Sequence, residues 1–407
     1  MIRFLAALIL SLFCAGPTLA QRAADRPVIL IGIDGFRADY MDRGLTPTLS
    51  RLAAEGAVAE GGMRPSFPTV TFPNFYTLAT GLHPDHHGLV YNTMQDPELP
   101  GRTFSMGARD EVMDPVWWND GEPIWVTAER AGVTSATLFW PGSEAAVRGQ
   151  RPTYWLPFEQ SITSRARVNL LLGWLRLPPE ERPGFATLYF DIVDTQGHHH
   201  GPDSDEVNAA IAEVDAAVAA LLAGLEAQGM QADLILVADH GMASTSGERI
   251  AWVDDWIPAQ AVDVFTYGPL AFIRPVEGRE GELDEALARD PEHMDCWRRE
   301  DLPERFAYGT HRRIAPVVCL SELGYTAGMR GRTDPARVRA GTHGFDPDAV
   351  EMQALFVAWG PSFEPAVRLP EMDSVDVQPL LGRLLGIELP AGDGTIEDSA
   401  RALRTAP

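Results

Sequence analysis

Hydrophobic residues in this chain form short continuous runs that end in acidic residues. The three clearest runs occupy 28–33 before Asp34, 186–190 before Asp191 and Asp194, and 234–238 before Asp239 and His240. Continuous apolar runs of this length are typical of strands that are buried on both faces of a parallel sheet. We therefore predict three buried parallel strands, each followed by acidic side chains.

Helical patterns lie between these runs. They cover 46–55, 164–175 and a long amphipathic stretch from about 205 to 228, for which Ser204 or Asp205 provides the start signal. Alternation of strand and helix predicts an α/β fold. In such folds ligands bind beyond the carboxyl ends of the strands, where Asp34, Asp194 and Asp239 are placed.

The C-terminal half is less regular. A fourth apolar run, 352–358, follows the segment 341–345, which places His343 on a loop before a strand. Residues from about 250 to 339 carry many charges and a predicted strand at 270–273, and we expect a small cap inserted on the main sheet. No internal repeat or Gly/Ser-rich linker separates domains.

The first twenty residues have the layout of a secretory signal. Arg3 precedes an apolar run, 4–13, and Thr18-Leu19-Ala20 ends the segment before Gln21. The run is too short to anchor the chain in a bilayer, and Phe13 argues against lipoprotein processing at Cys14. We expect residues 1–20 to be a signal peptide and the remaining protein to be exported, periplasmic or secreted, without a stable membrane anchor.

Charge and cysteine content exclude several classes of protein. With 33 basic and 57 acidic residues the net charge is -24, which disfavours binding to duplex nucleic acid. The sequence contains no lysine, which excludes Schiff-base and P-loop lysine chemistry. Cys296 and Cys319 are 23 positions apart, and the sequence leaves open whether they form a disulfide or remain two buried thiols.

Six side chains form the candidate metal site. Three carboxylates and three imidazoles come from loops at one predicted sheet edge, namely Asp34, Asp194, His198, Asp239, His240 and His343. Taken singly, such an aspartate is commonly a helix cap and such a histidine a structural residue. Four segments with the same chemistry at one edge favour metal binding instead. Mixed Asp/His ligation suits Zn²⁺, and six ligands suit two ions.

Thr71 is the candidate nucleophile. Pro73 lies just inside a predicted helix start and places Thr71 at or near the N-cap, where free backbone N–H groups and the helix dipole favour a phosphate oxyanion. A plain capping role is the alternative, and the neighbouring metal site favours the nucleophile. Two Zn²⁺ would balance the three aspartates and a Thr71 alkoxide.

The sequence closely resembles the nucleotide pyrophosphatase/phosphodiesterase family of the alkaline phosphatase superfamily, from about residue 28 to 395. The shared motifs, in chain order, are Ile33-Asp-Gly-Phe-Arg37, Met63-Arg-Pro, Pro68-Thr-Val-Thr-Phe-Pro-Asn74, Thr80-Gly-Leu-His-Pro84, His87-Gly88, Asn92, Gly121-Glu-Pro-Ile-Trp125, Phe139-Trp-Pro-Gly142, Asp194-Thr-Gln-Gly-His198, Ala238-Asp-His-Gly-Met242 and Gly341-Thr-His-Gly-Phe345.

The resemblance implies an alkaline-phosphatase-like three-layer α/β/α sandwich with a mostly parallel central sheet and a small inserted cap. It implies a catalytic domain over 27–395, with the cap at about 250–339 and a C-terminal tail at 396–407. One zinc ion would be held by Asp34, Thr71, Asp239 and His240, the other by Asp194, His198 and His343.

The family's nucleophile falls on Thr71 rather than Thr69, Asn92 matches a donor to a phosphate oxygen, and Phe72 forms one side of the slot for the esterified group. Phe158 lies where many relatives carry a stacking tyrosine. This chain has Thr93 where vertebrate relatives often carry a lysine. His199 and His200 are expected to be solvated or to lie behind the ligands.

The implied function is hydrolysis of phosphodiester or pyrophosphate bonds to release nucleoside 5′-monophosphates through a phospho-threonine. The alternatives are a phospholipid or choline-phosphodiester hydrolase, a phosphomonoesterase on the same scaffold, and an exported zinc-binding protein without catalysis. The sequence leaves the physiological substrate and the oligomeric state undetermined.

Overall fold

The computed structural model describes residues 19–404 apart from 371, so the expected signal peptide at 1–20 lies almost wholly outside the described residues. Its centre is an eight-stranded sheet with the order β18-β2-β17-β8-β1-β7-β5-β6. These strands are β1 (Val28–Ile33), β2 (Ala57–Ala59), β5 (Ser135–Leu138), β6 (Tyr154–Leu156), β7 (Phe185–Phe190), β8 (Asp233–Val237), β17 (Phe356–Trp359) and β18 (Val367–Leu369). The three apolar runs at 28–33, 186–190 and 234–238 therefore form strands that lie side by side, as predicted.

Strand β17 is the one strand that runs against the others. It pairs antiparallel with β8 and with β2, whereas the five remaining pairings in this sheet are parallel. The predicted run 352–358 begins as strand only at Phe356, after a 3₁₀ turn over Val350–Met352. Because β17 is reversed, the residues before it lie at the carboxyl edge of the parallel strands.

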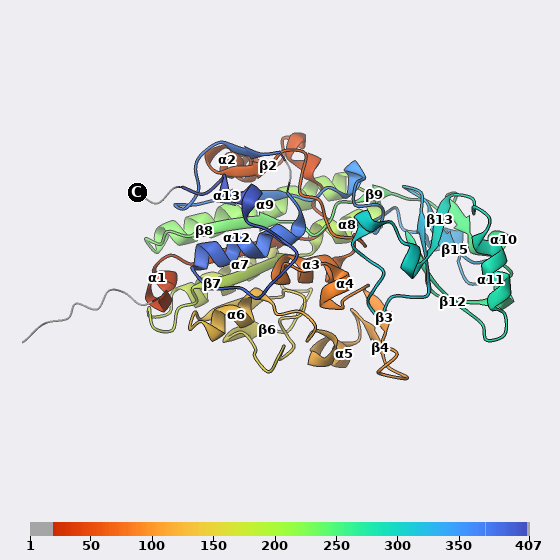
Figure 1. Cartoon of the computed structure of the whole chain (residues 1–407). Helices are drawn as coiled ribbons and strands as arrows, with labels where there is room; N and C mark the ends of the chain where they lie inside the picture. Colours follow the sequence, from red (N-terminus) through yellow and green to blue (C-terminus); the bar gives the residue numbers. More distant parts are fainter. Residues whose placement is uncertain (1–18, 371, 405–407) are drawn as a thin grey trace, which may run out of the picture.

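Helices cover both faces of the sheet, which confirms the three-layer α/β/α architecture (Figure 1). One layer contains α2 (Pro47–Glu55), α7 (Ser164–Leu175), α8 (Ile192–His200) and α9 (Asp205–Ala227), and the other contains α3 (Thr71–Thr80), α6 (Ile124–Arg130) and α12 (Val377–Leu385). Helix α9 is long and apolar enough to cross a membrane. It packs against α2, α7 and α8, so its apolar face belongs to the core.

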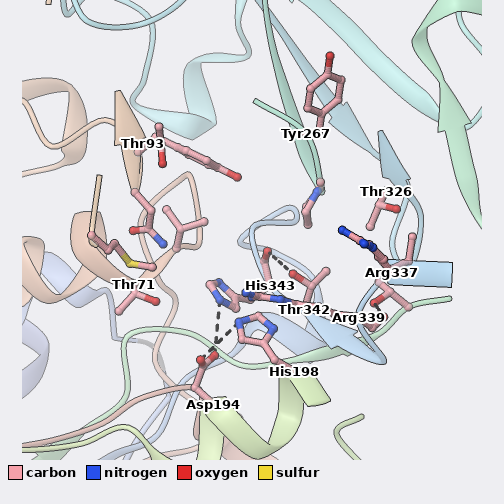
Figure 2. A pocket seen from close by; sticks show the side chains of 18 of the residues that line it. Thr71, Thr93, Asp194, His198, Tyr267, Thr326, Arg337, Arg339, Thr342 and His343 are labelled. Atoms are coloured by element: carbon pink, nitrogen blue, oxygen red, sulfur yellow. Dashed lines mark hydrogen bonds and ion pairs between the residues drawn. The ribbon is translucent and has the colours of Figure 1, made fainter. Parts of the chain in front are cut away.

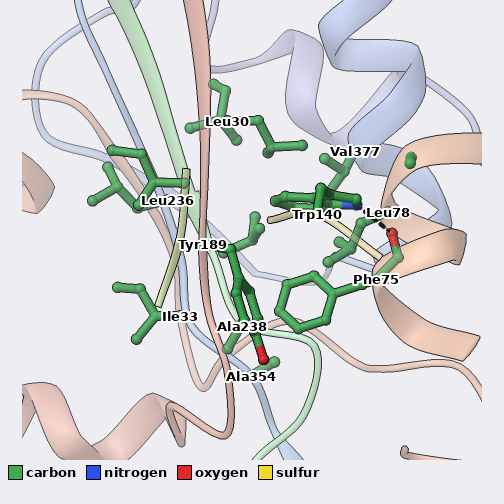
Figure 3. Packing of buried hydrophobic residues seen from close by; sticks show 14 of the residues in the cluster. Leu30, Ile33, Phe75, Leu78, Trp140, Tyr189, Leu236, Ala238, Ala354 and Val377 are labelled. Carbon is green, nitrogen blue, oxygen red and sulfur yellow. Dashed lines mark hydrogen bonds between the residues drawn. The ribbon is translucent and has the colours of Figure 1, made fainter. Parts of the chain in front are cut away.

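Large aromatic side chains fill the space between β1 and α3 (Figure 3). The Trp140 indole N–H donates to the Phe75 carbonyl at 2.9 Å. Residue 32 in the middle of β1 must be glycine, because a Cβ there would lie 2.6 Å from the Phe75 ring and 2.9 Å from the Trp140 ring. The close fit fixes α3, and therefore Thr71 at its start, against the strand that ends at Asp34.

The region expected as a cap carries its own small sheet at one end of the molecule (Figure 1). Its strand order is β11-β12-β14-β13, from β11 (Val262–Thr266), β12 (Leu270–Pro275), β13 (Met294–Arg298) and β14 (Val317–Ser321). With β10 (Ile250–Trp252), β15 (Thr326–Gly328), α10 (Val253–Trp256) and α11 (Glu280–Leu287) it encloses a separate hydrophobic cluster.

A disulfide joins Cys296 and Cys319. The sequence had left open whether these two residues form a disulfide or remain thiols. The two residues are directly opposite each other on the antiparallel strands β13 and β14, with their Cα atoms 4.0 Å apart. The bond ties the outermost strand of the cap sheet to its neighbour.

Short elements complete the chain. They are α1 (Leu19–Asp25), α4 (Pro84–His87), β3 (Thr93–Gln95), β4 (Thr103–Ser105), α5 (Arg109–Met113), β9 (Ala243–Ser244), β16 (Gly341–Thr342) and α13 (Glu397–Ala400). The expected C-terminal tail is packed up to residue 404. The Glu364 N–H donates to the Ala402 carbonyl, and the Arg404 N–H donates to the Ser362 carbonyl.

Candidate metal centre and phosphoryl-transfer site

Three strand ends bring the predicted carboxylates together. Asp34 follows β1, Asp239 follows β8, and Asp194 lies in the first turn of α8 after β7. His343 reaches the same place because the reversed strand β17 starts at this edge. The six candidate ligands fall into two groups, Asp34 with Asp239 and His240, and Asp194 with His198 and His343. Within each group the potential ligand atoms all lie within 4.8 Å of one another.

Gly35 allows the strand ends to approach this closely. Its φ is +67°, and a Cβ at this position would lie 2.9 Å from the Asp194 Cβ. The Gly35 N–H donates to Asp239 Oδ1 at 3.2 Å. A glycine between the two carboxylates therefore both makes room for Asp194 and orients Asp239.

Each carboxylate has an oxygen that accepts no hydrogen bond. These buried atoms are Asp34 Oδ1, Asp194 Oδ1 and Asp239 Oδ2. The second oxygen of Asp34 accepts the Tyr189 hydroxyl at 2.5 Å. In the described part of the chain no arginine pairs with any of the three. A buried carboxylate oxygen that accepts no hydrogen bond is disfavoured, so the arrangement fits a bound cation.

A hydrogen bond from Nδ1 to a backbone carbonyl orients each of the three histidines. The Nδ1–H of His198 donates to the Gly341 carbonyl at 2.8 Å, that of His240 to the Gly241 carbonyl at 2.9 Å, and that of His343 to the Thr69 carbonyl at 2.9 Å. A carbonyl oxygen can only accept, so in the neutral ring Nε2 carries the lone pair. This is the usual way in which a metal-binding histidine is oriented.

Each Nε2 faces the carboxylates of its own group. His240 Nε2 lies 2.9 Å from Asp239 Oδ2 and 3.6 Å from Asp34 Oδ1. In the other group, Asp194 lies 3.4 Å from His198 Nε2 and 3.5 Å from His343 Nε2 (Figure 2). The His240 and His343 rings stack with their centroids 3.5 Å apart, so the two groups adjoin. The six residues thus form two adjoining candidate metal-binding groups.

The pKa values reflect this crowding. Burial, and then the charges of Asp239 and Asp194, raise the pKa of Asp34 well above its ordinary value. Burial also raises the pKa of Asp194 and lowers that of His343 well below its ordinary value. Burial alone would lower the pKa of His240, but Asp239 raises it above the ordinary value. A cation bound here would relieve the repulsion among the carboxylates.

Thr71 lies beside the first group. It is the first residue of α3, with Val70 as the N-cap, and its Oγ1 is 3.3 Å from His240 Nε2. Thr69, the other threonine of the motif, is fully buried and donates its hydroxyl to the Phe345 carbonyl at 2.9 Å. Of the two hydroxyls, only that of Thr71 faces the candidate metal ligands.

The start of α3 offers fewer free N–H groups than the sequence suggested. The Phe72 N–H donates to Asn92 Oδ1 at 2.9 Å, Pro73 has no N–H, and the Asn74 N–H donates to the Val70 carbonyl. The Phe72 and Asn74 N–H groups therefore bond within the protein. The bond to Phe72 fixes the Asn92 amide, and Asn92 lines the same cavity as Thr71.

Two cavities meet at Thr71. The smaller, of about 230 Å³, is lined by Phe72, Phe158 and Tyr189 together with Glu144 and Asp191. Phe158 is 39% exposed, and its ring contacts those of Phe139 and Tyr189. Phe72 and Phe158 therefore line the same cavity, which we call the slot. His199 lines the larger cavity and His200 does not.

Sequence reasoning missed two residues of this slot. Tyr189 lies within the apolar strand β7, and its hydroxyl donates to Asp34 Oδ2. The hydroxyl was the only signal of this contact that its own residue type offered. Glu144 follows the Phe139-Trp-Pro-Gly142 motif, and its Oε1 accepts the Phe158 N–H at 2.9 Å. Its contact could be found only once the loop carrying Phe158 was folded.

Comparison with known proteins gives a consistent result. The model of the type I phosphodiesterase / nucleotide pyrophosphatase family matches residues 28–346. An uncharacterized pyrophosphatase/phosphodiesterase of Schizosaccharomyces pombe is 37% identical over 91% of this chain and 79% of its own length. Ectonucleotide pyrophosphatase/phosphodiesterase family member 1 of Rattus norvegicus is 34% identical over 94% of this chain, which spans only 43% of that protein.

This chain also resembles a solved structure over the whole length of that structure. It is an inactive threonine-to-alanine variant of murine ectonucleotide pyrophosphatase / phosphodiesterase 5 in complex with AMP. It matches with a TM-score of 0.87 and 30% identity, over 93% of this chain and 100% of that one.

Proposed function

The chain belongs to the type I phosphodiesterase / nucleotide pyrophosphatase family of the alkaline phosphatase superfamily, and from this premise we propose that it is an exported two-zinc enzyme that releases nucleoside 5′-monophosphates. One observation carries the proposal. Three buried carboxylate oxygens without partners and three oriented imidazole nitrogens converge beside the hydroxyl of Thr71. The AMP complex of the murine relative supports a nucleotide substrate. The names of the relatives, an ectonucleotide enzyme among them, support export.

The ligand assignment follows the two groups. Asp34, Asp239 and His240, with Thr71, would hold one zinc ion, and Asp194, His198 and His343 the other. When bound, the two ions would supply positive charge to the scissile phosphate and lower the pKa of the Thr71 hydroxyl.

The protein residues then account for the steps. Thr71 Oγ1 gives its proton to solvent and attacks phosphorus, and the bond to the leaving oxygen breaks with its electron pair on that oxygen. Water next attacks the same phosphorus, the bond to Oγ1 breaks, and the threonine hydroxyl is restored. Asn92 Nδ2 donates to a non-bridging phosphate oxygen throughout. Such a donor contributes about 3–4 kcal/mol to the transition state in comparable sites.

The slot explains a preference for diesters. Its described lining residues include no arginine. Besides Asp34 and Asp194 of the metal groups, they include Asp191 and Glu144, whose charges pair with Arg167 and Arg109. A neutral nucleoside fits there, with its base against Phe72 and Phe158 at about 1–3 kcal/mol for stacking, and an additional anionic oxygen does not. Arg37 pairs with Asp39 and Arg64 with Asp348, so neither provides the clamp that a monoester would require.

The direct test is the Thr71→Ala variant. We expect the hydrolysis of p-nitrophenyl thymidine 5′-monophosphate to fall by at least about 10³-fold, because the attacking atom is removed. Thr71→Ser keeps a hydroxyl and is the matched control, with activity at least about tenfold above that of Thr71→Ala. Metal content should remain at two ions in both variants, measured by elemental analysis.

Three chromogenic esters distinguish the alternatives. The proposal expects p-nitrophenyl thymidine 5′-monophosphate to have a higher kcat/KM than p-nitrophenyl phosphate or p-nitrophenyl phosphorylcholine. Faster turnover of the monoester or the choline ester would overturn the substrate assignment. A zinc-binding protein without catalysis would turn over none of the three.

A further inference from the structure

The larger cavity at the site, of about 770 Å³, lies on the side of the second metal group. Asp194, His198 and His343 line it, whereas none of Asp34, Asp239 and His240 does. The residues that line both this cavity and the slot are Thr71, Met106, Gln160, Asp194 and Thr195, so the two spaces meet at the candidate nucleophile. The binding site therefore offers the substrate two compartments, the slot and the larger cavity, which meet at Thr71.

In-line displacement decides which compartment receives the leaving group. The leaving oxygen lies opposite the attacking oxygen in such a reaction. Thr71 Oγ1 contacts His240 of the first group, so the leaving oxygen lies toward the second group, from which the larger cavity opens. The slot then holds the retained nucleoside, and the larger cavity holds what departs.

The two compartments differ in the charged side chains that line them. Among the described residues that line the larger cavity, Asp194 is the one carboxylate, and it belongs to the candidate metal site. The same lining contains Arg337 and Arg339 (Figure 2). This is notable in a chain with a net charge of -24, where random placement would favour acidic linings. The described slot lining contains no arginine. Besides Asp34 and Asp194 of the metal groups it has two carboxylates, Asp191 and Glu144, which pair with Arg167 and Arg109.

The backbone around these arginines is fixed to the metal site. The Ala340 N–H donates to the His198 carbonyl at 3.2 Å, and the Thr245 hydroxyl donates to the Arg339 carbonyl at 2.8 Å. Arg339 is thus held four residues before His343. Arg337 has one ion-pair partner, Asp334 at 3.6 Å, and these two side chains are 87% and 57% exposed. An exposed pair of this kind is weak, so the guanidinium is free to bind a ligand.

We propose that Arg337 and Arg339 bind a phosphate on the leaving group. The preferred substrates are then nucleotides that carry at least one phosphate beyond the scissile one, as opposed to diesters whose leaving group is neutral or cationic. Guanidinium groups suit phosphate because they donate several hydrogen bonds in a fixed plane. The inference rests on the proposed function and narrows its substrate class.

The kinetic test uses three substrates that share the retained thymidine monophosphate. They are thymidine triphosphate, whose leaving group is pyrophosphate, thymidine diphosphoglucose, whose leaving group is a sugar phosphate, and p-nitrophenyl thymidine 5′-monophosphate, whose leaving group has no phosphate. In the double variant Arg337→Gln/Arg339→Gln we expect the kcat/KM ratio of either phosphorylated substrate to the nitrophenyl ester to fall about tenfold or more. A decrease limited to the triphosphate assigns the contact to pyrophosphate, and a decrease for both assigns it to the first departing phosphate.

A matched control removes the same charge elsewhere. Arg368→Gln lies on the edge strand β18, away from the cavity lining, and should leave the ratio unchanged. Arg337→Lys/Arg339→Lys keeps the charge and should restore part of the ratio. An unchanged ratio in the double glutamine variant, or an equal loss for all three substrates, would overturn the inference.

Binding gives a second readout that does not depend on turnover. In a metal-loaded Thr71→Ala background, calorimetry should show that the two glutamine substitutions weaken binding of α,β-methylene thymidine triphosphate by about tenfold and leave binding of thymidine monophosphate unchanged. Equal affinities with and without the arginines would contradict the proposal. Failure of the proposed function is recognised separately, because the wild-type protein would then hydrolyse none of the three substrates.

Discussion

Two sets of buried carboxylates in this molecule differ in how their oxygens are used. At the sheet edge, Asp34, Asp194 and Asp239 each keep an oxygen that accepts no hydrogen bond. At the junction between α4, β3 and the segment 309–313, Asp85 and Asp96 have both oxygens bonded. Asp85 accepts three backbone N–H groups and the Thr310 hydroxyl, and Asp96 accepts Arg312, Arg313 and the Glu98 N–H.

Their pKa values differ in the same sense. Burial and neighbouring carboxylates raise the pKa of Asp34. Burial alone would raise the pKa of Asp96, but hydrogen bonds from Arg312 and Arg313 lower it to about 2. The difference shows how a buried carboxylate that holds the fold together can be distinguished from one that awaits a cation. Both kinds of carboxylate are buried, and they differ in whether every carboxylate oxygen accepts a hydrogen bond.

We expect the largest loss of activity, without a loss of stability in the metal-free protein, from Asp239→Asn. Loss of a ligand removes several kcal/mol of transition-state stabilisation, which corresponds to a decrease in kcat/KM of about 10³-fold or more. The metal-free variant should be at least as stable as the metal-free wild type, because the substitution relieves repulsion with Asp34. Elemental analysis and thermal unfolding after chelation check the two statements. A destabilised metal-free variant would show that Asp239 also serves the fold.

Asp96→Asn should lower the stability of the fold and leave metal binding intact. Arg313 is fully buried against Asp96, at 2.7 Å, and removal of the carboxylate leaves its charge without a full partner. We expect unfolding free energy to fall by about 3–5 kcal/mol, measured by urea titration, with two metal ions still bound to the folded protein. Loss of metal without loss of stability would reverse the roles assigned to the two sets.

Acid should destabilise the fold by protonating the hydrogen-bonded carboxylate of Asp96. The folded-state pKa of Asp96 is about 2, below that of the unfolded chain, so its contribution is present above pH about 4 and is lost as the pH falls toward 2. The contribution is about 2–3 kcal/mol. Unfolding experiments between pH 5 and 2 on the metal-free protein, with Asp96→Asn as reference, should show the slope in the wild type and a shallower one in the variant. Equal slopes would argue against the contribution.

The smallest effect is expected from Tyr189→Phe, which removes the hydrogen bond to Asp34 Oδ2 and leaves a second oxygen without a partner. Loss of a group that orients a metal ligand typically lowers metal affinity by about 10- to 100-fold. Zinc titration of the metal-free protein measures this, and an unchanged affinity would show that the tyrosine does not orient Asp34.

Much of this architecture follows from local sequence. The run 28–33 forms a strand with the predicted limits, and α7 spans the predicted residues 164–175. Continuous apolar runs identify central strands because both faces are covered, and the acidic residue after each run marks the edge where ligands collect. The location of Asp34, Asp194 and Asp239 at one edge was therefore predictable.

Features that depend on long-range pairing were not predictable. The reversal of β17 rests on its pairing with β8, and the bond between Asn92 and Phe72 joins residues 20 positions apart. The arginines at 337 and 339 lie in an irregular segment whose only local pattern is charge. Their position beside His343 depends on the contacts of residues 339 and 340 with Thr245 and His198.

The central claim is that two zinc ions occupy the two ligand groups beside Thr71. Anomalous diffraction at the zinc edge, from crystals of the protein as purified, tests it directly. The account predicts two peaks, one about 2.0–2.2 Å from the ligand atoms of Asp34, Asp239 and His240 and one at similar distances from Asp194, His198 and His343. Fewer than two peaks at these positions, or a Thr71 hydroxyl directed away from them, would contradict it.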